Sequence, residues 1–301
     1  MNDNLKLPTF FVAGSQKSGT TTIHNLLNQN TQISLPEYKE THFFSSDYNK
    51  GINWYLKQFI ENKYKIRGEV DPSYMFFPNV YKNIKESIRN PKFIFIFRKP
   101  LDRSYSHYIM SSSRGYEPLT FFEAIELEKD RIDNDKNLFS FSNHSYLLRS
   151  EYSNQILEFL KYFKDIKPLF LKFDDLLELE KRKKVYTQIC QFLDIEILEE
   201  MDFTITSNKA STYRNKFLRN NLYNDTYLRR VMKRIFFSKK VRNKIRNKLY
   251  TMNSKAMNRD DLKKEKEEIF SQLPEKYISW NNKEVRKIQK ITNLDLEDWI
   301  I

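Results

Sequence analysis

The stretch of sequence that decides the fold is residues 10–22, which read Phe10-Phe11-Val12-Ala13-Gly14-Ser15-Gln16-Lys17-Ser18-Gly19-Thr20-Thr21-Thr22. Its apolar start predicts a buried strand, and the polar turn after it predicts the entry to a helix. Gly14 and Gly19 have the spacing of the phosphate-binding loop G-x-x-x-x-G-K-[ST]. Thr20, however, stands where that motif has its lysine, and the lysine of this segment is Lys17, three positions earlier. We therefore expect a phosphate cradle at a helix N-terminus that lacks the usual partners of a γ-phosphate and its Mg²⁺. A chance turn rich in Gly, Ser and Thr is the alternative.

The composition is that of a folded chain, and its 301 residues suffice for one large domain or two small ones. The 24 Phe and 18 Tyr residues supply large apolar side chains for a core. Cys190 is the only cysteine, which excludes an internal disulfide and suits a reducing compartment. Residues 1–7 have no signal-peptide pattern, and no apolar run is long enough to span a bilayer, so we expect a cytoplasmic protein.

Segments typical of strands and of helices alternate along the first part of the chain. The expected strands are 10–13, 66–70, 93–97 and 169–173, and the expected helices are 20–28, 51–60, 101–113, 119–128 and 146–163. Such alternation predicts a parallel sheet covered by helices on both faces. After residue 174 the chain reads as mainly helical.

The residues that follow each expected strand are candidate site residues, because open parallel sheets bind ligands beyond the carboxyl ends of their strands. Arg98 directly follows the strand at 93–97, and Pro100 begins the next helix. Ser106 lies about two turns into that helix. An arginine fork and a hydroxyl together suit a second phosphate. A surface arginine beside a solvated helix is the alternative.

A carboxylate and a loop of mixed charge complete the candidates. Glu69 lies in an otherwise apolar strand end, an unfavourable place for a carboxylate that has neither a partner nor a function. It suits a general base that acts on a hydroxyl, and a glutamate of an edge strand facing water is the alternative. The loop 36–44 sets Lys39 and His42 among aromatic residues, which by itself is a weak indication.

Together these segments resemble the sulfotransferases that use 3′-phosphoadenylyl sulfate (PAPS), most closely the heparan-sulfate type and its bacterial relatives. Residues 16–21 look like the 5′-phosphosulfate loop of that family, and residues 98–106 look like its 3′-phosphate motif. Residues 39–44 are similar to its K-E-x-H-F-F segment, and residues 69–74 to its E-K-x-P-x-Y segment, whose glutamate is the catalytic base by this resemblance. Val70 replaces the lysine that is frequent in the last segment, so no role of such a lysine carries over.

The resemblance implies an α/β, P-loop-like three-layer fold with a central parallel sheet flanked by helices and a helical C-terminal portion. It implies a single sulfotransferase domain, 1–301, with an α/β core at 1–215 and a mainly helical, basic part at 216–301. The activity implied is in-line transfer of a sulfuryl group from PAPS to a hydroxyl or amine of a carbohydrate or glycolipid acceptor. Adenosine 3′,5′-bisphosphate is the product, and no metal is needed. The aromatic residues at 43–44 and 74–77 are expected to stack on sugar rings.

The resemblance also assigns roles to single residues. Glu69 is the expected base, His42 is the alternative base, and Lys17 neutralises charge on the bridging oxygen. The residues expected to bind the donor are Lys17, Ser18, Gly19, Thr20, Thr21, Thr22, Arg98, Ser106 and, at lower specificity, Arg214. The residues expected to bind the acceptor are Lys39, His42, Asp71 and Tyr74.

Most of the net charge of +13 comes from the segment 214–250, which holds 13 Lys and Arg residues against one acid, Asp225. Its apolar residues from 228 to 249 keep helical spacing. Two surface helices packed on the domain are one interpretation. Attraction to an anionic membrane surface, which would make the protein membrane-peripheral, or to an anionic polysaccharide is the other. No specific binding of nucleic acid is expected.

Two other functions stay open on the sequence alone. A P-loop kinase of small molecules would need ATP and Mg²⁺, and Thr20 in the position of the loop's lysine argues against it. A non-enzymatic basic binding protein would leave Lys17, Glu69 and Arg98 at strand ends without a role.

Overall fold

The computed structural model of the protein describes residues 7–59, 64–198, 200–205, 211–213, 248, 252, 254–256 and 258–301. The chain divides into two compact units, and the expectation of a single domain stays a prediction. The first unit consists of Met1–Pro100, Glu151–Asn208 and Trp280–Ile301, and the second of Leu101–Ser150 and Lys209–Ser279. Arg214 and nearly all of the basic segment 214–250 lie outside the described residues. Among the helices of the described part of the chain, none is both long and apolar enough to cross a membrane.

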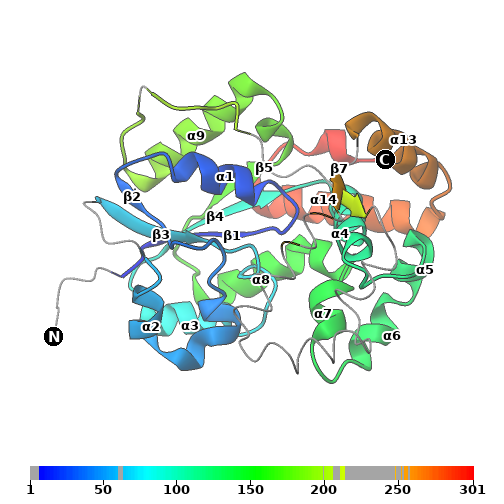
Figure 1. Ribbon diagram of the computed structural model, residues 1–301, viewed down its shortest axis with the longest axis horizontal. Helices are drawn as coiled ribbons and strands as arrows, with labels where there is room; N and C mark the ends of the chain where they lie inside the picture. Colours follow the sequence, from blue (N-terminus) through cyan, green and yellow to red (C-terminus); the bar gives the residue numbers. More distant parts are fainter. Residues whose placement is uncertain are drawn as a thin grey trace. The chain divides into compact units, whose positions relative to one another are not determined.

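A five-stranded parallel sheet forms the centre of the first unit (Figure 1). Its strands are β1 (Phe10–Gly14), β2 (Ile33–Ser34), β3 (Ile66–Val70), β4 (Lys92–Phe97) and β5 (Leu169–Lys172), in the spatial order β2-β3-β1-β4-β5. The four strands expected from the sequence are confirmed. Within this sheet only β2 was not expected, because a strand of two residues has no periodicity that could be read from the sequence.

Helices cover both faces of this sheet, as the sequence predicts. Figure 1 shows α1 and α9 above the sheet and α2, α3 and α8 below it. The helices of this unit are α1 (Thr20–Leu27), α2 (Ile52–Leu56), α3 (Val80–Ser87), α8 (Tyr152–Tyr162), α9 (Leu179–Leu193) and the larger part of α14 (Glu275–Thr292). Side chains of β1 alternate between two buried clusters, since Phe10 and Val12 pack with α1 and α9, whereas Phe11 and Ala13 pack with the helices of the opposite face. The three-layer α/β fold is thereby confirmed.

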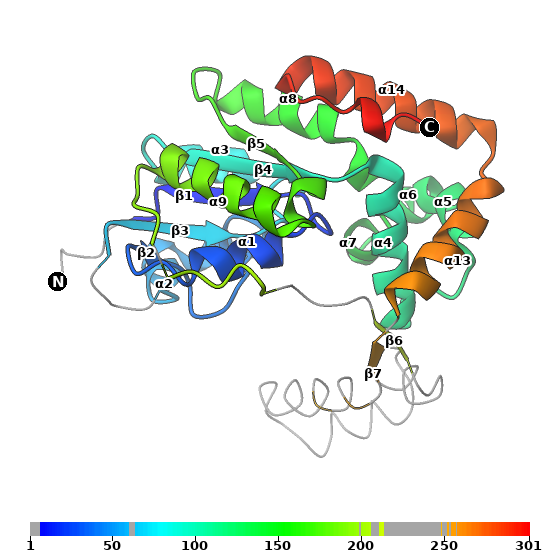
Figure 2. The ribbon, with the colours of Figure 1, turned by 90° about the horizontal axis from the view of Figure 1, so that it is seen from above.

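The second unit consists mainly of helices and has a polar interior. Its elements are the greater part of α4 (Pro100–Ser113), α5 (Phe121–Glu126), α6 (Glu128–Asp133), α7 (Phe139–Asn143), α13 (Arg259–Ser271) and the antiparallel pair of β6 (Ser211–Tyr213) and β7 (Ser254–Ala256), seen in Figure 2. Arg103 is fully buried and donates hydrogen bonds to the carbonyl of Tyr146 and to Ser150 Oγ. Buried Glu128 accepts the N–H groups of Leu147 and Leu148 at 2.7 and 2.8 Å.

These contacts explain one difference from the expected helices. The sequence predicts a helix over 146–163, but α8 begins only at Tyr152. Side chains of Arg103 and Glu128 bind backbone groups around Tyr146 that a helix would use, so the chain turns there instead. The helix expected at 119–128 is likewise two short helices, which meet at Leu127.

The carboxyl ends of β1, β3 and β4 meet at one edge of the sheet, because β1 pairs with β3 on one side and with β4 on the other. Backbone hydrogen bonds continue this pairing beyond the strands. Asp71 N–H donates to the carbonyl of Val12 at 3.1 Å, and Ser15 N–H donates to the carbonyl of Ile96 at 2.7 Å. The segments that follow the three strands are therefore fixed to one another.

The pairing of β3 with β1 places the ring of Phe10 over Gly68. A Cβ atom at this position would lie 2.2 Å from Cε1 of Phe10, which is fully buried. We expect Gly68→Ala to lower the free energy of unfolding by about 1–3 kcal/mol, the usual cost of overpacking, in equilibrium urea denaturation. Adding Phe10→Leu should recover part of that loss. Equal stability of Gly68→Ala and the wild type would contradict this account of the pairing.

Candidate active site

The turn between β1 and α1, residues 14–19, is a compact polar loop. Ser15 Oγ lies 2.6 Å from Ser18 Oγ and donates to the carbonyl of Ile96 at 3.2 Å. Lys17 has a left-handed φ of 72°, a conformation that non-glycine residues keep only where their surroundings fix it. Ser18 is fully buried, so its side chain holds the loop together rather than facing outward.

The loop leads directly into the N-terminus of α1. Gly19 precedes the helix with a φ of 85°, and a Cβ atom there would lie 2.8 Å from Leu176 Cδ1, so glycine is required. The N–H groups of Thr20 and Thr21 belong to the first turn, where an α-helix supplies no partners of its own. No acidic residue lies in that turn. This end of α1 is therefore suited to an anion.

Arg98, which follows β4, reaches the same loop. Its guanidinium donates to the carbonyl of Lys17 at 3.2 Å and lies 4.8 Å from the centre of the Phe173 ring. The structure thus brings together two of the predicted donor-binding cations, Lys17 and Arg98. Ser106 is half-buried on α4 and belongs to the second unit, so its part in the 3′-phosphate site stays a prediction.

Glu69, near the end of β3, is fully buried and accepts three hydrogen bonds. Thr41 N–H donates to Oε1 at 2.8 Å, while the hydroxyls of Tyr55 and Tyr74 donate to Oε2 at 2.6 and 2.8 Å. Burial, followed by the negative charge of Asp71, raises the pKa of Glu69 to about 7, although the hydrogen bonds oppose that rise. The carboxylate that the sequence singled out as the base is enclosed by protein.

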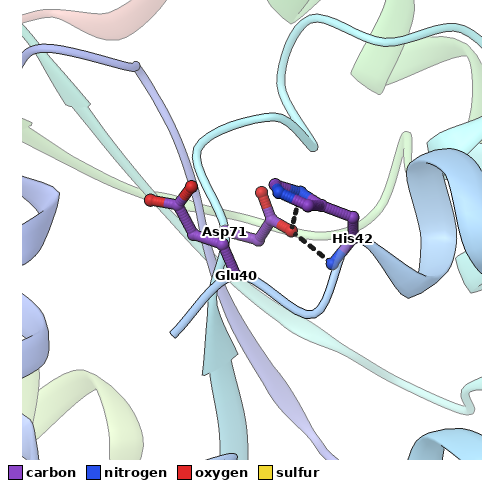
Figure 3. A group of neighbouring side chains, drawn as sticks. All are labelled: Glu40, His42 and Asp71. Atoms are coloured by element: carbon purple, nitrogen blue, oxygen red, sulfur yellow. Dashed lines mark hydrogen bonds and ion pairs between the residues drawn. The ribbon is translucent and has the colours of Figure 1, made fainter. Parts of the chain in front are cut away.

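Asp71 is a second fully buried carboxylate, and it binds His42. Its Oδ2 accepts both the backbone N–H and the ring Nδ1–H of His42, each at 2.9 Å (Figure 3). The hydrogen bond to Asp71 raises the pKa of His42 to about 9, against the opposing effect of burial. The imidazole is therefore protonated at neutral pH and remains partly exposed.

Glu40 joins this group, although the sequence analysis gave it no role. A carboxylate oxygen of Glu40, a ring nitrogen of His42 and a carboxylate oxygen of Asp71 lie within 4.8 Å of one another (Figure 3). Glu40 also forms an ion pair with Lys39, and its side chain is 32% exposed. The sequence did offer one indication of a role for Glu40: it lies in the K-E-x-H-F-F segment between Lys39 and His42, which were both predicted to bind the acceptor.

The structure separates the other expected acceptor-binding residues into accessible and inaccessible ones. Lys39 and His42 are partly exposed. Asp71 and Tyr74 are fully buried, so contact of either side chain with an acceptor stays a prediction. Stacking of a sugar on Phe43, Phe44 or Tyr74 is not supported, because all three rings are fully buried within the aromatic core; Met75 is buried too, and only Phe76 and Phe77 are partly exposed.

This edge of the sheet therefore carries a helix N-terminus with two cations beside it, next to a cluster of carboxylates and one imidazolium. These features define a protein of the P-loop-like α/β class with a helix N-terminus suited to an anion and a separate cluster of carboxylates with one imidazole. Residues 7–289 match the sulfotransferase domain family, and the chain belongs to that family, an enzyme class. The resemblance read from the sequence is confirmed.

Known proteins of this family show similarity over parts of the chain. The membrane-associated sulfotransferase kil1 of Dictyostelium discoideum is 39% identical over 112 residues, which cover 36% of this chain and 24% of that protein. The human bifunctional heparan sulfate N-deacetylase/N-sulfotransferase 2 is 29% identical over 171 residues, 52% of this chain and 19% of that protein. The chain thus spans about a quarter or less of the length of these two relatives. A crystal structure of a sulfotransferase from Alicyclobacillus acidocaldarius has the same fold, with a TM-score of 0.66 at 18% identity over 98% of this chain and 99% of that one.

The bond between His42 and Asp71 predicts a pH dependence of stability. Because the pKa of His42 in the folded state is about 9, above its ordinary 6.5, the stabilisation is complete below about pH 6.5 and is lost as the pH rises through 9. The difference in melting temperature between the wild type and His42→Gln should therefore be largest near pH 6 and shrink by pH 10. A difference that stays constant over this range in thermal unfolding would show that the imidazolium–carboxylate bond does not form.

Proposed function

We propose that this protein transfers a sulfuryl group from PAPS to a carbohydrate acceptor. One observation supports this most. The proposed anion site at 14–21 and the cluster of Glu40, His42 and Asp71 lie at the ends of two adjacent strands, β1 and β3. A transferase needs both, one to hold an anionic donor and the other to activate a hydroxyl or amine.

The described residues fit the donor. The N–H groups of Thr20 and Thr21 would receive the 5′-phosphate at the positive end of α1, whose first turn contains no acidic residue. Lys17 would lie against the bridging oxygen, where negative charge develops. Arg98 is the candidate cation for the 3′-phosphate, and its contact with the loop carbonyl would hold the two parts of the donor site in a fixed relation. When bound, PAPS supplies the sulfuryl group: the acceptor forms its bond to sulfur while the bond from sulfur to the bridging oxygen breaks.

The proton of the acceptor needs a base, and exposure distinguishes the candidates. Glu69, the base expected from the sequence, is fully buried with both oxygens hydrogen-bonded. His42, the alternative, is protonated at neutral pH because its pKa is about 9, so it cannot accept a further proton. Glu40 is a partly exposed carboxylate of the same cluster. We propose Glu40 as the base, with His42 as a cation that binds sulfuryl or acceptor oxygens.

The proposed acceptor class rests on relatives rather than on a pocket. Curated relatives include heparan sulfate N-sulfotransferases and, in the mouse, heparan sulfate glucosamine 3-O-sulfotransferase 3B1 at 29% identity over 122 residues. Lys39 and His42 would suit an acceptor that carries negative charge. A glycolipid that bears such a sugar fits the same chemistry.

Binding of the product nucleotide tests the donor assignment. Adenosine 3′,5′-bisphosphate at 1 mM should raise the melting temperature of the protein by several degrees, because it binds the folded state alone. ATP with Mg²⁺ and a DNA duplex should raise it far less. Stabilisation by ATP with Mg²⁺ alone would favour a kinase and overturn the proposal, and stabilisation by DNA alone would favour a nucleic-acid-binding protein.

Three Glu→Gln variants test the base. With [³⁵S]PAPS and chemically desulfated heparan sulfate as acceptor, Glu40→Gln should lower kcat by roughly 100-fold or more, the usual range for a general base, without weakening nucleotide binding. Glu37→Gln, an exposed glutamate of the same loop, is the matched control and should keep normal turnover. Normal turnover of Glu40→Gln, together with a 100-fold loss in a stably folded Glu69→Gln, would return the role of base to Glu69.

A further inference from the structure

The turn that presents Glu40 and His42 is held in a conformation that it would not adopt unaided. Both residues have left-handed φ values, 66° and 55°, and neither is glycine. The left-handed conformation is unfavourable for a residue with a Cβ atom, so the surrounding structure must fix it. Two buried carboxylates do so by accepting consecutive backbone N–H groups, Glu69 that of Thr41 and Asp71 that of His42.

Glu69 is in turn held by two tyrosines from different parts of the first unit. Tyr55 comes from α2 and Tyr74 from the turn after β3, and both are fully buried. Burial, followed by the charge of Glu69, raises the pKa of each phenol well above its ordinary value. Both hydroxyls therefore stay protonated and donate hydrogen bonds to Oε2 of Glu69.

The same two side chains contact the turn directly. The ring of Tyr55 stacks on Phe43 with centroids 4.4 Å apart and planes 4° from parallel. The hydroxyl of Tyr74 accepts the N–H of Phe44 at 3.3 Å and lies 3.5 Å from Thr41 Oγ1. Each tyrosine thus contacts residues 41–44 directly, in addition to its hydrogen bond to Glu69.

We propose that Tyr55 and Tyr74 are positioning residues for group transfer, which act through Glu69 to fix the backbone of residues 40–42 and with it Glu40 and His42. Both side chains are fully buried, so the effect of each on the reaction would be transmitted through the turn. The expected effect on catalysis rests on the proposed function. The hydrogen bonds that hold the turn do not depend on it. This positioning also gives buried Glu69 a role other than that of base.

The chain offers a matched control for the hydroxyl groups. Tyr81 lies on α3 in the same aromatic core as Tyr55, is 4% exposed, and its hydroxyl has no hydrogen-bond partner within the described part of the chain. Tyr→Phe at any of the three positions removes one buried hydroxyl and keeps the ring. Only at Tyr55 and Tyr74 does it remove a donor from Glu69.

The test combines amide hydrogen exchange by mass spectrometry with steady-state kinetics on the full chain. Tyr55→Phe and Tyr74→Phe should each speed exchange in peptides that cover residues 40–46 by about tenfold or more. Each should also lower kcat for [³⁵S]PAPS and desulfated heparan sulfate by about tenfold, with the KM for PAPS and the affinity for adenosine 3′,5′-bisphosphate unchanged. Tyr81→Phe should change none of these quantities.

Two results would overturn the proposal: unchanged exchange and unchanged kcat in both variants, or the same changes in Tyr81→Phe, which would indicate a general loss of stability. A wild-type protein that transfers no sulfate would instead count against the proposed function. In that case the exchange measurements still decide whether the two hydroxyls hold the turn, and unchanged exchange overturns the inference.

Discussion

The pairing of β3 with β1 is the constraint on which the rest of the site depends. The register places Glu69 beside Phe11 and Val70 beside Val12, so the chain leaves both strands at the same level of the sheet. Gly68 leaves room for the ring of Phe10, and the backbone bond from Asp71 to Val12 extends the pairing past the strand ends. The carboxylates at the end of β3 and the loop after β1 are thereby held at one edge of a parallel sheet, where such folds bind ligands.

Two opposite electrostatic environments result at that edge. The loop at 14–21 offers backbone N–H groups and the cations Lys17 and Arg98, whereas the end of β3 gathers Glu69 and Asp71 in full burial. Buried carboxylates are unfavourable unless they are hydrogen-bonded. Here backbone N–H groups of the turn at 40–42 help to satisfy them, so the same bonds that make the burial tolerable also set the positions of Glu40 and His42.

Much of this architecture could be predicted from the sequence, because it depends on strong local patterns. The apolar run at 93–97 has β-branched and aromatic residues throughout, and the loop at 14–19 has two of the five glycines of the chain. The strand ends then predicted Lys17, Glu69 and Arg98 as candidate site residues without any structure. The short strand β2 and the start of α8 were missed, since they depend on tertiary contacts and not on periodicity.

The roles within the site were harder to predict, because they follow from burial and from long-range hydrogen bonds. Glu69 reads as a base in the sequence, yet three donors enclose it in the fold. Tyr55, in a short amphipathic helix, reads as an ordinary core residue. Its bond to Glu69 joins residues 14 positions apart and leaves no pattern in the chain.

The most direct test of the account is a crystal structure of the protein with adenosine 3′,5′-bisphosphate. The account predicts that the 5′-phosphate lies on the N–H groups of Thr20 and Thr21, with Lys17 and Arg98 in contact with the nucleotide and the turn at 40–42 still bonded to Glu69 and Asp71. Glu40 and His42 should face the open side of the 5′-phosphate. A nucleotide bound away from the loop, or a turn released from both carboxylates when the nucleotide is bound, would contradict it.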